Sequence, residues 1–513
     1  METNNLTRNI SHSTSDGTQS QPISQEELLT IPHAAELPTL EEAHRTKIPT
    51  LTHVPKAARG QWSKALTSLS ERIVRNPEIQ TLWTLLSIFP RCILPAGKDP
   101  RQADAYSQAR IVKERLARWG RGEYRQMWDE SVKACMTPTR GRKKKSESQP
   151  SQEDKNVKRA LRLAREGQYS RSLQSLLSAG MAQNTRANIK EMKDKHPQEP
   201  VADQVQGPLP DQDTPQISLT VDQVVNCIKS FRKGTAPGPS GLRAEHLKEA
   251  IRSVPPNRTD KAAAAITGLV NCMGGGKVPA EVAPYLCGAA LFAAVKKDGS
   301  LRPIAVGEIL RRLTSKGFSR VSAEKAAGIL SPHQLGVGVP GGCEGIAHTV
   351  RQVVEEDPDL LVLRVDLINA FNTADRWTTF REMERLFPEC MNWIRTCYGG
   401  QVELVFGDTI IMSSVGFHQG DPLASLLFSV NLQPVIEMIR HEVPTLKLNA
   451  WYLDDGILVG RKEELQMVID ILLREGPARG LHLSMTKSDV WCPSDIFGIG
   501  EDPLDRGNVV SPL

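Results

Sequence analysis

The sequence of 513 residues predicts a mixed α/β (α+β) fold that follows a helical N-terminal region. Between residues 216 and 492, short apolar runs typical of strands alternate with stretches of helical spacing. Alternation of this kind is typical of a sheet that is covered by helices on one face. From residue 61 to about residue 134, apolar residues recur at near-helical spacing, which predicts helices there.

The N-terminal part divides into two regions by composition. Residues 1–60 are rich in Ser, Thr, Gln, Asn and Pro and show little periodicity, so we predict a disordered tail. Residues 61–135 are predicted to be a helical, basic region, whose apolar positions interleave with Arg115, Arg118, Arg121 and Arg125. This pattern allows two interpretations, a nucleic-acid-binding helical module or a plain solvated helix bundle.

Residues 136–158 are predicted to be a basic flexible linker. They contain the run Arg140-Gly141-Arg142-Lys143-Lys144-Lys145, followed by Ser, Pro and Gln. Such a run can be a nuclear-import signal, a phosphate contact or only a linker. Residues 159–200 are predicted to form a helical hairpin, and residues 501–513 a tail.

The overall composition narrows the class of protein. The formal net charge of +5 is a mild basic excess, which fits nucleic-acid binding without proving it. Nine cysteines are scattered without metal-ligand spacing. This favours reduced thiols in an intracellular protein, nuclear or cytoplasmic, and argues against a zinc finger. No signal-peptide pattern opens the chain, and the longest apolar stretch, residues 283–295, is too short to span a membrane.

The elements of the core follow from apolar periodicity and turn residues. Asp298-Gly299 joins two apolar runs and predicts a hairpin. Pro422 fits the first turn of a helix, which the apolar run after it would continue. We expect strands at residues 289–295, 301–306, 360–365, 402–406 and 409–413, a hairpin around residues 451–459, and helices at residues 221–231, 244–251, 307–316, 342–354, 377–386 and 462–474.

The first candidate chemical group is the adjacent pair Asp454 and Asp455. With Gly456 they lie between apolar, β-prone runs, where Asp-Gly is a strong hairpin signal. Two carboxylates this close repel each other and serve no packing purpose, and their natural partner is a hard divalent cation such as Mg²⁺. The competing interpretation is an ordinary solvated surface turn.

Asp366 is the second candidate, because it stands at the end of the apolar run of residues 360–365. The end of a buried strand is a usual place for a functional group in an α/β sheet, although Asp366 could instead cap the next helix. If neighbouring strands bring it to Asp454 and Asp455, the three carboxylates can hold two metal ions. That arrangement serves in-line phosphoryl or nucleotidyl transfer.

Three blocks of sequence, in this order, resemble the motifs of a known family. They are Val365-Asp366-Leu367-Ile368-Asn369-Ala370-Phe371-Asn372 (motif A), Gly416-Phe417-His418-Gln419-Gly420-Asp421-Pro422-Leu423 (motif B) and Tyr452-Leu453-Asp454-Asp455 (motif C). They resemble reverse transcriptases, and most closely those of non-LTR (LINE-like) retrotransposons. Residues 234–242, 301–304 and 480–488 match further blocks, so the resemblance covers roughly residues 216–492. It implies right-hand polymerase fingers at residues 216–345 and a palm at residues 346–500, with no evident thumb.

The resemblance implies an RNA-directed DNA polymerase that acts on an RNA template, a DNA primer and a dNTP. Asp366, Asp454 and Asp455 would bind two Mg²⁺ ions, with Mn²⁺ as an alternative. Lys487 would act as a cation or proton donor near the departing pyrophosphate, although a solvated lysine is an equal interpretation of that residue.

The resemblance also implies a nucleotide site. Lys296 and Arg302 on the hairpin would hold the triphosphate by charge-assisted bonds, whereas a solvated turn is the alternative for the lysine. Phe371 would lie under the incoming sugar and exclude a 2′-hydroxyl, unless it is only a core residue. Gln419 and Gly420 would cradle the templating base and the new pair.

Two other functions remain open at this stage. Only 26 residues follow Lys487 (513 − 487), so we expect neither a thumb nor an endonuclease domain. The chain could therefore be a truncated, non-catalytic nucleic-acid-binding relic of such an element. An RNA-dependent RNA polymerase would share the palm but conflicts with Phe371. The template, the priming mechanism and the oligomeric state are not specified by the sequence.

Overall fold

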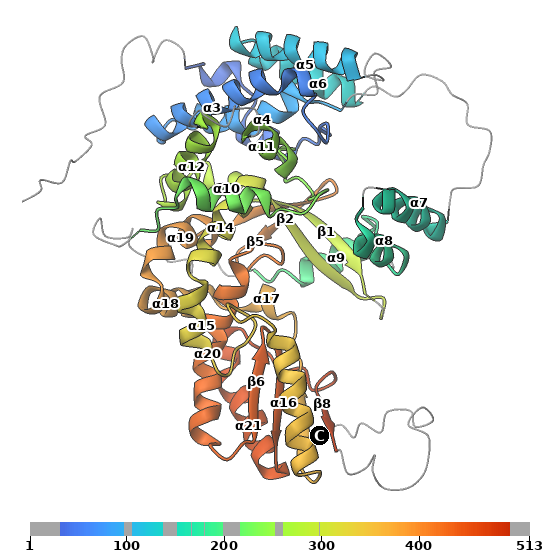
Figure 1. The fold of residues 1–513 in the computed structure, drawn as a ribbon, viewed down its shortest axis with the longest axis vertical. Helices are drawn as coiled ribbons and strands as arrows, with labels where there is room; N and C mark the ends of the chain where they lie inside the picture. The colour runs from blue at the N-terminus through green and yellow to red at the C-terminus, as the bar shows by residue number, and fades with distance from the viewer. Residues whose placement is uncertain are drawn as a thin grey trace, which may run out of the picture.

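The computed structural model describes residues 31–96, 105–136, 151–165, 167–178, 180–198, 216–251, 260–296 and 298–492. Its elements form three levels (Figure 1), with N-terminal helices at the top, fingers around one sheet in the middle and a palm around a second sheet below. Each sheet has four strands among the described residues. The mixed helix-and-sheet fold with polymerase fingers and palm is the one that the sequence predicts.

The N-terminal level consists of helices that pack on the fingers. In α3, Trp62, Leu66, Leu69 and Ile73 recur at helical spacing and are buried. This helix packs against α11 and α12 of the fingers, so the level is continuous with the polymerase core. Its elements are η1 (Ala34–Glu36), α2 (Leu40–Arg45), η2 (Lys56–Ala58), α3 (Arg59–Arg75), α4 (Gln80–Ile93), α5 (Ala105–Gly120) and α6 (Tyr124–Met136).

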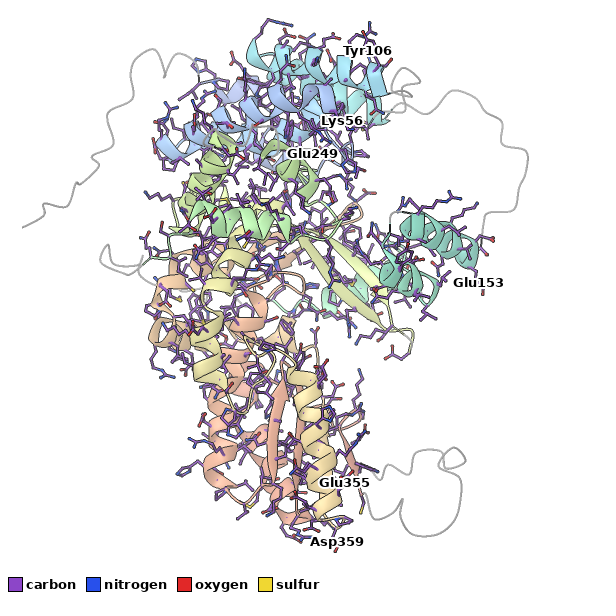
Figure 2. The ribbon with its side chains drawn as sticks, viewed as in Figure 1. Lys56, Tyr106, Glu153, Glu249, Glu355 and Asp359 are labelled. Atoms are coloured by element: carbon purple, nitrogen blue, oxygen red, sulfur yellow. The ribbon has the colours of Figure 1, made fainter. Side chains whose placement is uncertain are left out.

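Residues 31–60 fold against this level, so the prediction of a disordered tail is wrong for them. Leu40 and Val54 are buried, although they belong to no periodic pattern. The carboxylate of Glu249, on the fingers, accepts a hydrogen bond from the Val54 N–H at 2.7 Å. Figure 2 shows Glu249 where the N-terminal helices meet the fingers. Single contacts of this kind leave no periodic signal in a polar sequence. Residues 1–30, the rest of the predicted tail, lie outside the described part of the chain.

The arginines of the predicted basic region are paired inside the N-terminal level. The partners are Ser131 for Arg115, Glu123 and Glu130 for Arg118, Glu123 for Arg121, and Asp129 and Glu42 for Arg125. Most of these partners are carboxylates, which neutralise the positive charge locally. The pairing favours the helix-bundle interpretation of these four residues over a phosphate-binding one.

A second helical group lies beside the fingers sheet (Figure 1). Helices α7 (Gln152–Arg165) and α8 (Tyr169–Leu176) form a hairpin, and α9 (Arg186–Asp194) follows them. Helix α7 begins within the segment that we predicted as a flexible linker, and the acidic residues of its first turn favour a helix start there. The basic run at residues 140–145 lies outside the described residues.

The fingers sheet has the strand order β2-β1-β4-β5. Strands β1 (Ala289–Val295) and β2 (Leu301–Gly307) form the predicted antiparallel hairpin. Strand β4 (Val402–Phe406) runs parallel to β1 and pairs with β5 (Thr409–Ser413), both with the predicted bounds. The helices of this level are α10 (Val221–Lys229), α11 (Ala244–Ile251), α12 (Lys261–Gly274), α13 (Ala283–Leu286), α14 (Ile309–Val321) and α15 (Ala323–Leu330).

The palm sheet has the strand order β6-β7-β3-β8, and all its pairs are antiparallel. Its strands are β3 (Leu361–Val365), β6 (Leu448–Tyr452), β7 (Asp455–Gly460) and β8 (Asp489–Trp491). Its helical elements are α16 (Gly342–Glu356), α17 (Ala370–Thr373), α18 (Arg376–Leu386), η5 (Pro388–Cys390), α19 (Met391–Tyr398), α20 (Ala424–Glu442), α21 (Lys462–Glu475) and η6 (Pro477–Arg479).

Helices cover both faces of the palm sheet, whereas we expected them on one face. On β3, Val362 packs with Val354 of α16, and its neighbour Leu363 belongs to the large core that includes Leu472 of α21. Successive residues of a strand point to opposite faces, so two consecutive apolar residues bury both. The three consecutive apolar residues at the start of β3, Leu361–Leu363, are the signal that favours this arrangement.

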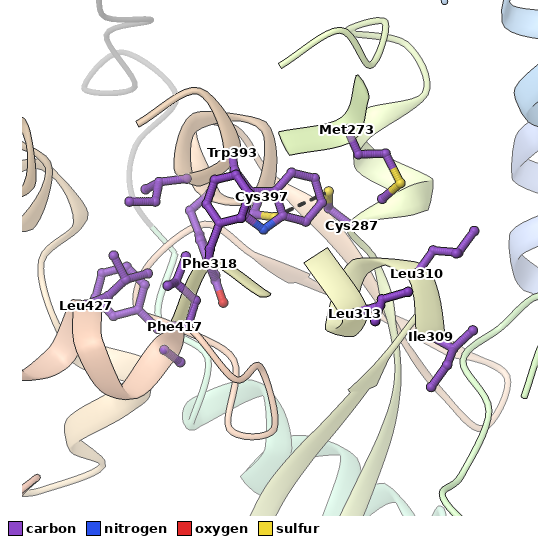
Figure 3. Close-up of a cluster of buried hydrophobic side chains, with 14 of the residues drawn as sticks. Met273, Cys287, Ile309, Leu310, Leu313, Phe318, Trp393, Cys397, Phe417 and Leu427 are labelled. Carbon is purple, nitrogen blue, oxygen red and sulfur yellow. Dashed lines mark hydrogen bonds between the residues drawn. The ribbon is translucent and has the colours of Figure 1, made fainter. Parts of the chain in front are cut away.

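One large hydrophobic core joins the N-terminal level, the fingers and part of the palm. Figure 3 shows the region where Phe318 of α14 and Met273 of α12 lie near Trp393 of α19. The Trp393 Nε1–H donates to Ser315 Oγ at 3.1 Å, which ties α19 to α14. Fingers and palm therefore share buried side chains. Among the described residues, no helix is both long and apolar enough to cross a bilayer.

Candidate active site

The palm sheet brings the three candidate carboxylates to one end. Asp366 directly follows β3, and the predicted motif C hairpin is formed by β6 and β7, with Asp454 in its turn and Asp455 at the start of β7. Val365 of β3 is paired with Gly456 of β7, so the end of β3 lies beside this turn. Antiparallel pairing therefore accounts for the approach of residues that are far apart in the chain.

The backbone of the motif C turn is held by a buried glutamine that sequence analysis did not identify. Leu453 has a left-handed backbone conformation (φ 58°), which costs energy for a branched residue. Its N–H donates to Gln334 Oε1 at 2.8 Å, and Gln334 Nε2 donates back to the Leu453 carbonyl at 3.0 Å. The Gly336 N–H also donates to Gln334 Oε1 (3.0 Å), which fixes the glutamine itself. Both polar groups of the turn residue beside Asp454 are thus satisfied by one side chain.

The three carboxylates disturb one another electrostatically. Burial raises the pKa of Asp454, and the charges of Asp455 and Asp366 raise it further. The pKa of Asp455 is also raised, first by burial and then by Asp366. Arg302 opposes both shifts. The negative charge of these aspartates is therefore only partly compensated by positive side chains of the protein.

The donor chemistry of Asp366, Asp454 and Asp455 suits hard divalent cations. The donors are carboxylate oxygens, which Mg²⁺ and Mn²⁺ prefer, and a bound cation would relieve the repulsion that raises the pKa values of Asp454 and Asp455. In the described part of the chain, no group of three or more His, Cys, Asp or Glu side chains lies close enough together to hold a metal ion as the chain stands. Asp366, Asp454 and Asp455 line a cavity, with room for substrate oxygens beside them.

That cavity measures about 1070 Å³ and lies between fingers and palm. All the site residues that we predicted from the sequence line this cavity. They come from both the fingers and the palm, and from segments up to 191 positions apart (487 − 296). The predicted residues along its wall are Lys296, Arg302, Asp366, Phe371, Gln419, Gly420, Asp454, Asp455 and Lys487. The structure brings all of them together, and it adds charged residues of α9 that sequence analysis did not connect with the site.

The fingers hairpin supplies positive charge to the cavity. Lys296 follows β1, and Arg302 lies on β2 opposite Ala294 and is exposed. The pKa of Lys296 is lowered, first by burial and then by the nearby charges of Lys487, Arg302 and Lys195. Mutual repulsion of these cations indicates a site for an anion. Lys297, the second lysine of the predicted turn, lies outside the described residues.

Phe371 combines the two interpretations that the sequence leaves open. Its ring stacks on Phe428 of α20, with centroids 4.8 Å apart and planes 18° from parallel. Its carbonyl accepts from the Phe417 N–H at 2.6 Å, which fixes the backbone. The side chain is half-buried and also lines the cavity. It is therefore a core contact on one side and a wall of the cavity on the other.

The motif B loop is fixed to the fingers through its backbone. Gln419 accepts a hydrogen bond at its carbonyl from the Ala305 N–H of β2 (3.2 Å). Gly420 has φ 120°, and a Cβ there would lie 2.8 Å from the Ala305 carbonyl oxygen. Only glycine fits both the conformation and the close approach.

A buried polar network lies under motif B, and sequence analysis missed it. Asp421 Oδ2 accepts from Arg311 Nη2 at 3.0 Å and from the Tyr398 hydroxyl at 2.9 Å. The pKa of His418 lies well below its ordinary value because of burial and the charge of Arg311, so the ring is neutral. Its Nδ1 accepts from Arg311 Nη1 at 2.9 Å, and its Nε2–H donates to Ser413 Oγ at 3.1 Å. The network joins α14 of the fingers to the loop that carries Gln419.

Lys487 lies in a turn that is tied to motif A. The Asp366 N–H donates to Ser488 Oγ (3.1 Å), and the Ser484 N–H donates to the Asp366 carbonyl (2.9 Å). Lys487 is exposed between these two serines and lines the cavity. The turn thus carries a cation on the same backbone connection that holds Asp366.

Part of the chain matches a known protein family. Residues 294–503 match the family described as reverse transcriptase (RNA-dependent DNA polymerase). A search of curated proteins gave no match. Similar solved structures include a telomerase from Candida albicans with a TWJ fragment of telomeric RNA (12% identity, TM-score 0.32), over 42% of this chain and 44% of that one. An apo telomerase from Candida tropicalis is similar over 40% of this chain and 44% of that one (11% identity, TM-score 0.32). The chain thus spans less than half the length of these two structures.

Proposed function

We propose that the protein is an RNA-directed DNA polymerase of the non-LTR retrotransposon type. The observation that carries the proposal is the convergence of acids, cations and an aromatic wall on one cavity. The three aspartates Asp366, Asp454 and Asp455 gather at the palm side, and Lys296 and Arg302 lie apart from them on the fingers hairpin. This separation suits a substrate whose reacting phosphate needs metal ions and whose outer phosphates need cations.

The three aspartates are the proposed ligands of two Mg²⁺ ions, or of Mn²⁺. When bound, such ions lower the pKa of an attacking hydroxyl and neutralise charge on a leaving pyrophosphate. Gln334 keeps the motif C turn in one geometry before substrate arrives, through its bonds to Leu453.

The proposed reaction joins a dNTP to a primer. The primer 3′-oxygen forms a bond to the α-phosphorus, and the bond from that phosphorus to the bridging oxygen breaks, so pyrophosphate leaves. Arg302 and Lys296 would bind the triphosphate, and Lys487 would place positive charge, or a proton, at the leaving oxygen. Phe371, fixed by Phe428, would exclude a 2′-hydroxyl from the sugar site.

The proposed partners are an RNA template and a DNA primer, with Gln419 and Gly420 next to the templating base. An intracellular place of action, nuclear or cytoplasmic, is part of the proposal. Its support is that all nine cysteines, each within the described residues, are free thiols, as is usual in reducing compartments.

Primer extension on poly(rA)/oligo(dT) with Mg²⁺ tests the proposal. Incorporation of dTMP, with little incorporation of UMP, is the expected result. The alternative is a truncated, non-catalytic nucleic-acid-binding relic of such an element. Binding of the primer-template without incorporation, in Mg²⁺ and in Mn²⁺, would establish that alternative.

A further inference from the structure

A segment upstream of the reverse transcriptase match, residues 180–198, forms part of the cavity wall. It begins as an extra strand-like contact on β1, where the Ala182 N–H donates to the Ala293 carbonyl (2.9 Å) and the Val295 N–H donates to the Gly180 carbonyl (3.2 Å). Strand β4 pairs only with the first two residues of β1, so this segment satisfies backbone groups that β4 leaves free. We refer to residues 180–198 as the upstream segment.

Helix α9, in the middle of the upstream segment, holds the start of β2. Met192 is fully buried in the small core of the fingers sheet. The Leu301 N–H donates to Glu191 Oε1 at 2.8 Å, and the Lys195 ammonium donates to the Leu301 carbonyl. Both backbone polar groups of Leu301 are therefore fixed by side chains of α9 and of the residue that follows it. The next residue along β2 is Arg302, so α9 helps to set the position of the proposed triphosphate ligand.

The end of the upstream segment holds motif A. Asn369 has a left-handed backbone (φ 50°), a conformation that Asn and Gly adopt more readily than other residues. Its Nδ2 donates to the Lys195 carbonyl at 2.8 Å. Further on, the Ser414 hydroxyl donates to the Pro197 carbonyl at 3.4 Å, which joins the segment to the residue after β5. Fingers hairpin and motif A turn are thus connected through Lys195.

The upstream segment also faces the cavity with charged groups. Glu191, Asp194 and Lys195 line it together with Lys296 and Arg302. Lys195 forms an ion pair with Glu191 (3.1 Å), so its charge is held in place on the wall.

We infer that the upstream segment is the outer wall of the nucleotide site, and that Lys195 and Asn369 position Arg302 and Phe371 around an incoming nucleotide. The inference rests on the proposed function, because it presumes a dNTP in this cavity. Lys195 acts on Arg302 through Leu301, and Asn369 lies two residues before Phe371 in the same turn. Both are positioning residues whose loss alters nucleotide binding more than the chemical step.

Two variants of the full chain test the inference. Asn369→Gly retains the left-handed backbone but removes the amide that bonds to Lys195, and Lys195→Ala removes the ammonium from Leu301. The matched control is Lys193→Ala, an exposed lysine on the same helix that does not line the cavity. Asn369→Gly also removes the acceptor of the Asn372 amide (2.9 Å), and Lys195→Ala also removes the ion pair with Glu191 (3.1 Å). Loss of the bond to Lys195 or to Leu301 predicts a rise of about fivefold in the KM for dTTP, with kcat within about twofold of wild type. Lys195→Arg retains a cationic donor and should restore most of the affinity.

The outcomes separate this inference from the proposed function. If wild type extends primers and both variants match Lys193→Ala in the KM for dTTP, the inference is overturned and the proposed function stands. If wild type extends no primer, the proposed function fails. Hydrogen exchange then decides whether the structural coupling exists. Asn369→Gly should speed exchange in residues 366–373 and 186–198, and unchanged exchange in both would overturn the inference.

Discussion

The side-chain amide of Gln334 bonds to both backbone polar groups of Leu453, at 2.8 Å and 3.0 Å, and so fixes the turn that carries Asp454. Gln334 is fully buried, and its neighbours Leu335 and His333 bond to the backbone of Trp451 on β6. A strained turn is stable only where its surroundings determine its conformation, and here a short backbone segment and one amide do so. The turn is thus pre-organised before any metal or nucleotide binds.

Gln334→Ala should impair the chemical step more than substrate binding. The substitution leaves the part-buried N–H and C=O of Leu453 without this partner, at a cost of about 1–3 kcal/mol in stability. A displaced Asp454 should lower kcat for dTTP incorporation by about tenfold to a hundredfold, with a smaller change in KM, because Arg302 is untouched. Steady-state primer extension and a thermal melt measure both effects.

Gln352→Ala, on the exposed face of α16, is the matched control and should behave as wild type. Gln334→Glu retains the acceptor oxygens but removes the donor to the Leu453 carbonyl. Its kcat should therefore fall between that of Gln334→Ala and that of the control variant. A kcat for Gln334→Ala equal to that of the control would show that the turn does not depend on the glutamine.

Asp454→Asn should stabilise the metal-free protein at neutral pH. The pKa of Asp454 in the folded protein is raised by burial and by its acidic neighbours, so the folded state holds this proton more tightly than the unfolded chain. Stability is therefore lost as pH rises from the ordinary aspartate range through the raised pKa. Removal of the charge should raise Tm by about 1–2 °C at pH 7 in EDTA.

Two conditions control this prediction. The difference in Tm should shrink as pH falls below the ordinary aspartate range, because the wild-type carboxyl is then protonated in both states. Excess Mg²⁺ should stabilise wild type and have less effect on the variant. A variant with a lower melting temperature than wild type in EDTA at pH 7 would show that the charge of Asp454 does not destabilise the metal-free fold.

Phe371→Val should weaken discrimination between deoxy- and ribonucleotides. The smaller side chain leaves space where the ring lines the cavity, so the ratio of UMP to dTMP incorporation should rise by about tenfold or more. Loss of the stack on Phe428 also predicts a stability decrease of about 0.5–1.5 kcal/mol beyond the lost burial. Competitive incorporation of UTP and dTTP measures the ratio.

Phe428→Leu separates the two roles of the stack, because it removes the supporting ring but keeps the wall of the cavity. Its melting temperature should fall, while its sugar discrimination should change less than that of Phe371→Val. Equal discrimination in wild type and Phe371→Val would remove Phe371 from the sugar site.

Asp421→Asn should destabilise the protein strongly, although it alters no predicted catalytic residue. Arg311 is buried, and Asp421 is its charged partner at 3.0 Å. A buried charge left unpaired costs about 3–5 kcal/mol. Tyr398→Phe keeps the charge of Asp421 and removes its hydrogen bond from the tyrosine hydroxyl, together with a longer one from the His418 N–H (3.4 Å), and should cost about 1 kcal/mol. Urea denaturation distinguishes the two, and a loss below 1 kcal/mol for Asp421→Asn would contradict the assignment.

Much of the fold could be predicted from local pattern. Helix α11 and strands β4 and β5 have the predicted bounds, because turn residues mark their ends and apolar residues their interiors. Helix α12 was missed, since its run of alanines is apolar on nearly every side and shows no single face. The candidate site residues belong to motifs of fixed spacing, and the structure brings every one of them to the same cavity.

The positioning residues could not be predicted, because their meaning depends on distant partners. Gln334 lies 119 positions from Leu453, and Lys195 lies 174 positions from Asn369. Neither residue belongs to a periodic pattern or to a motif with a chemical signature. An isolated polar residue in an apolar or basic context does not indicate, before the chain folds, which backbone group it will meet.

The most direct measurement of the central claim is primer extension on poly(rA)/oligo(dT) with Mg²⁺, with wild type and Asp454→Asn side by side and with melting temperatures recorded for both. The account predicts that only wild type incorporates dTMP. It also predicts that the Asp454→Asn variant is folded and has a melting temperature at least as high as that of wild type. Equal incorporation by both proteins would contradict the assignment of Asp454 to the metal site, and incorporation by neither would contradict the proposed polymerase activity.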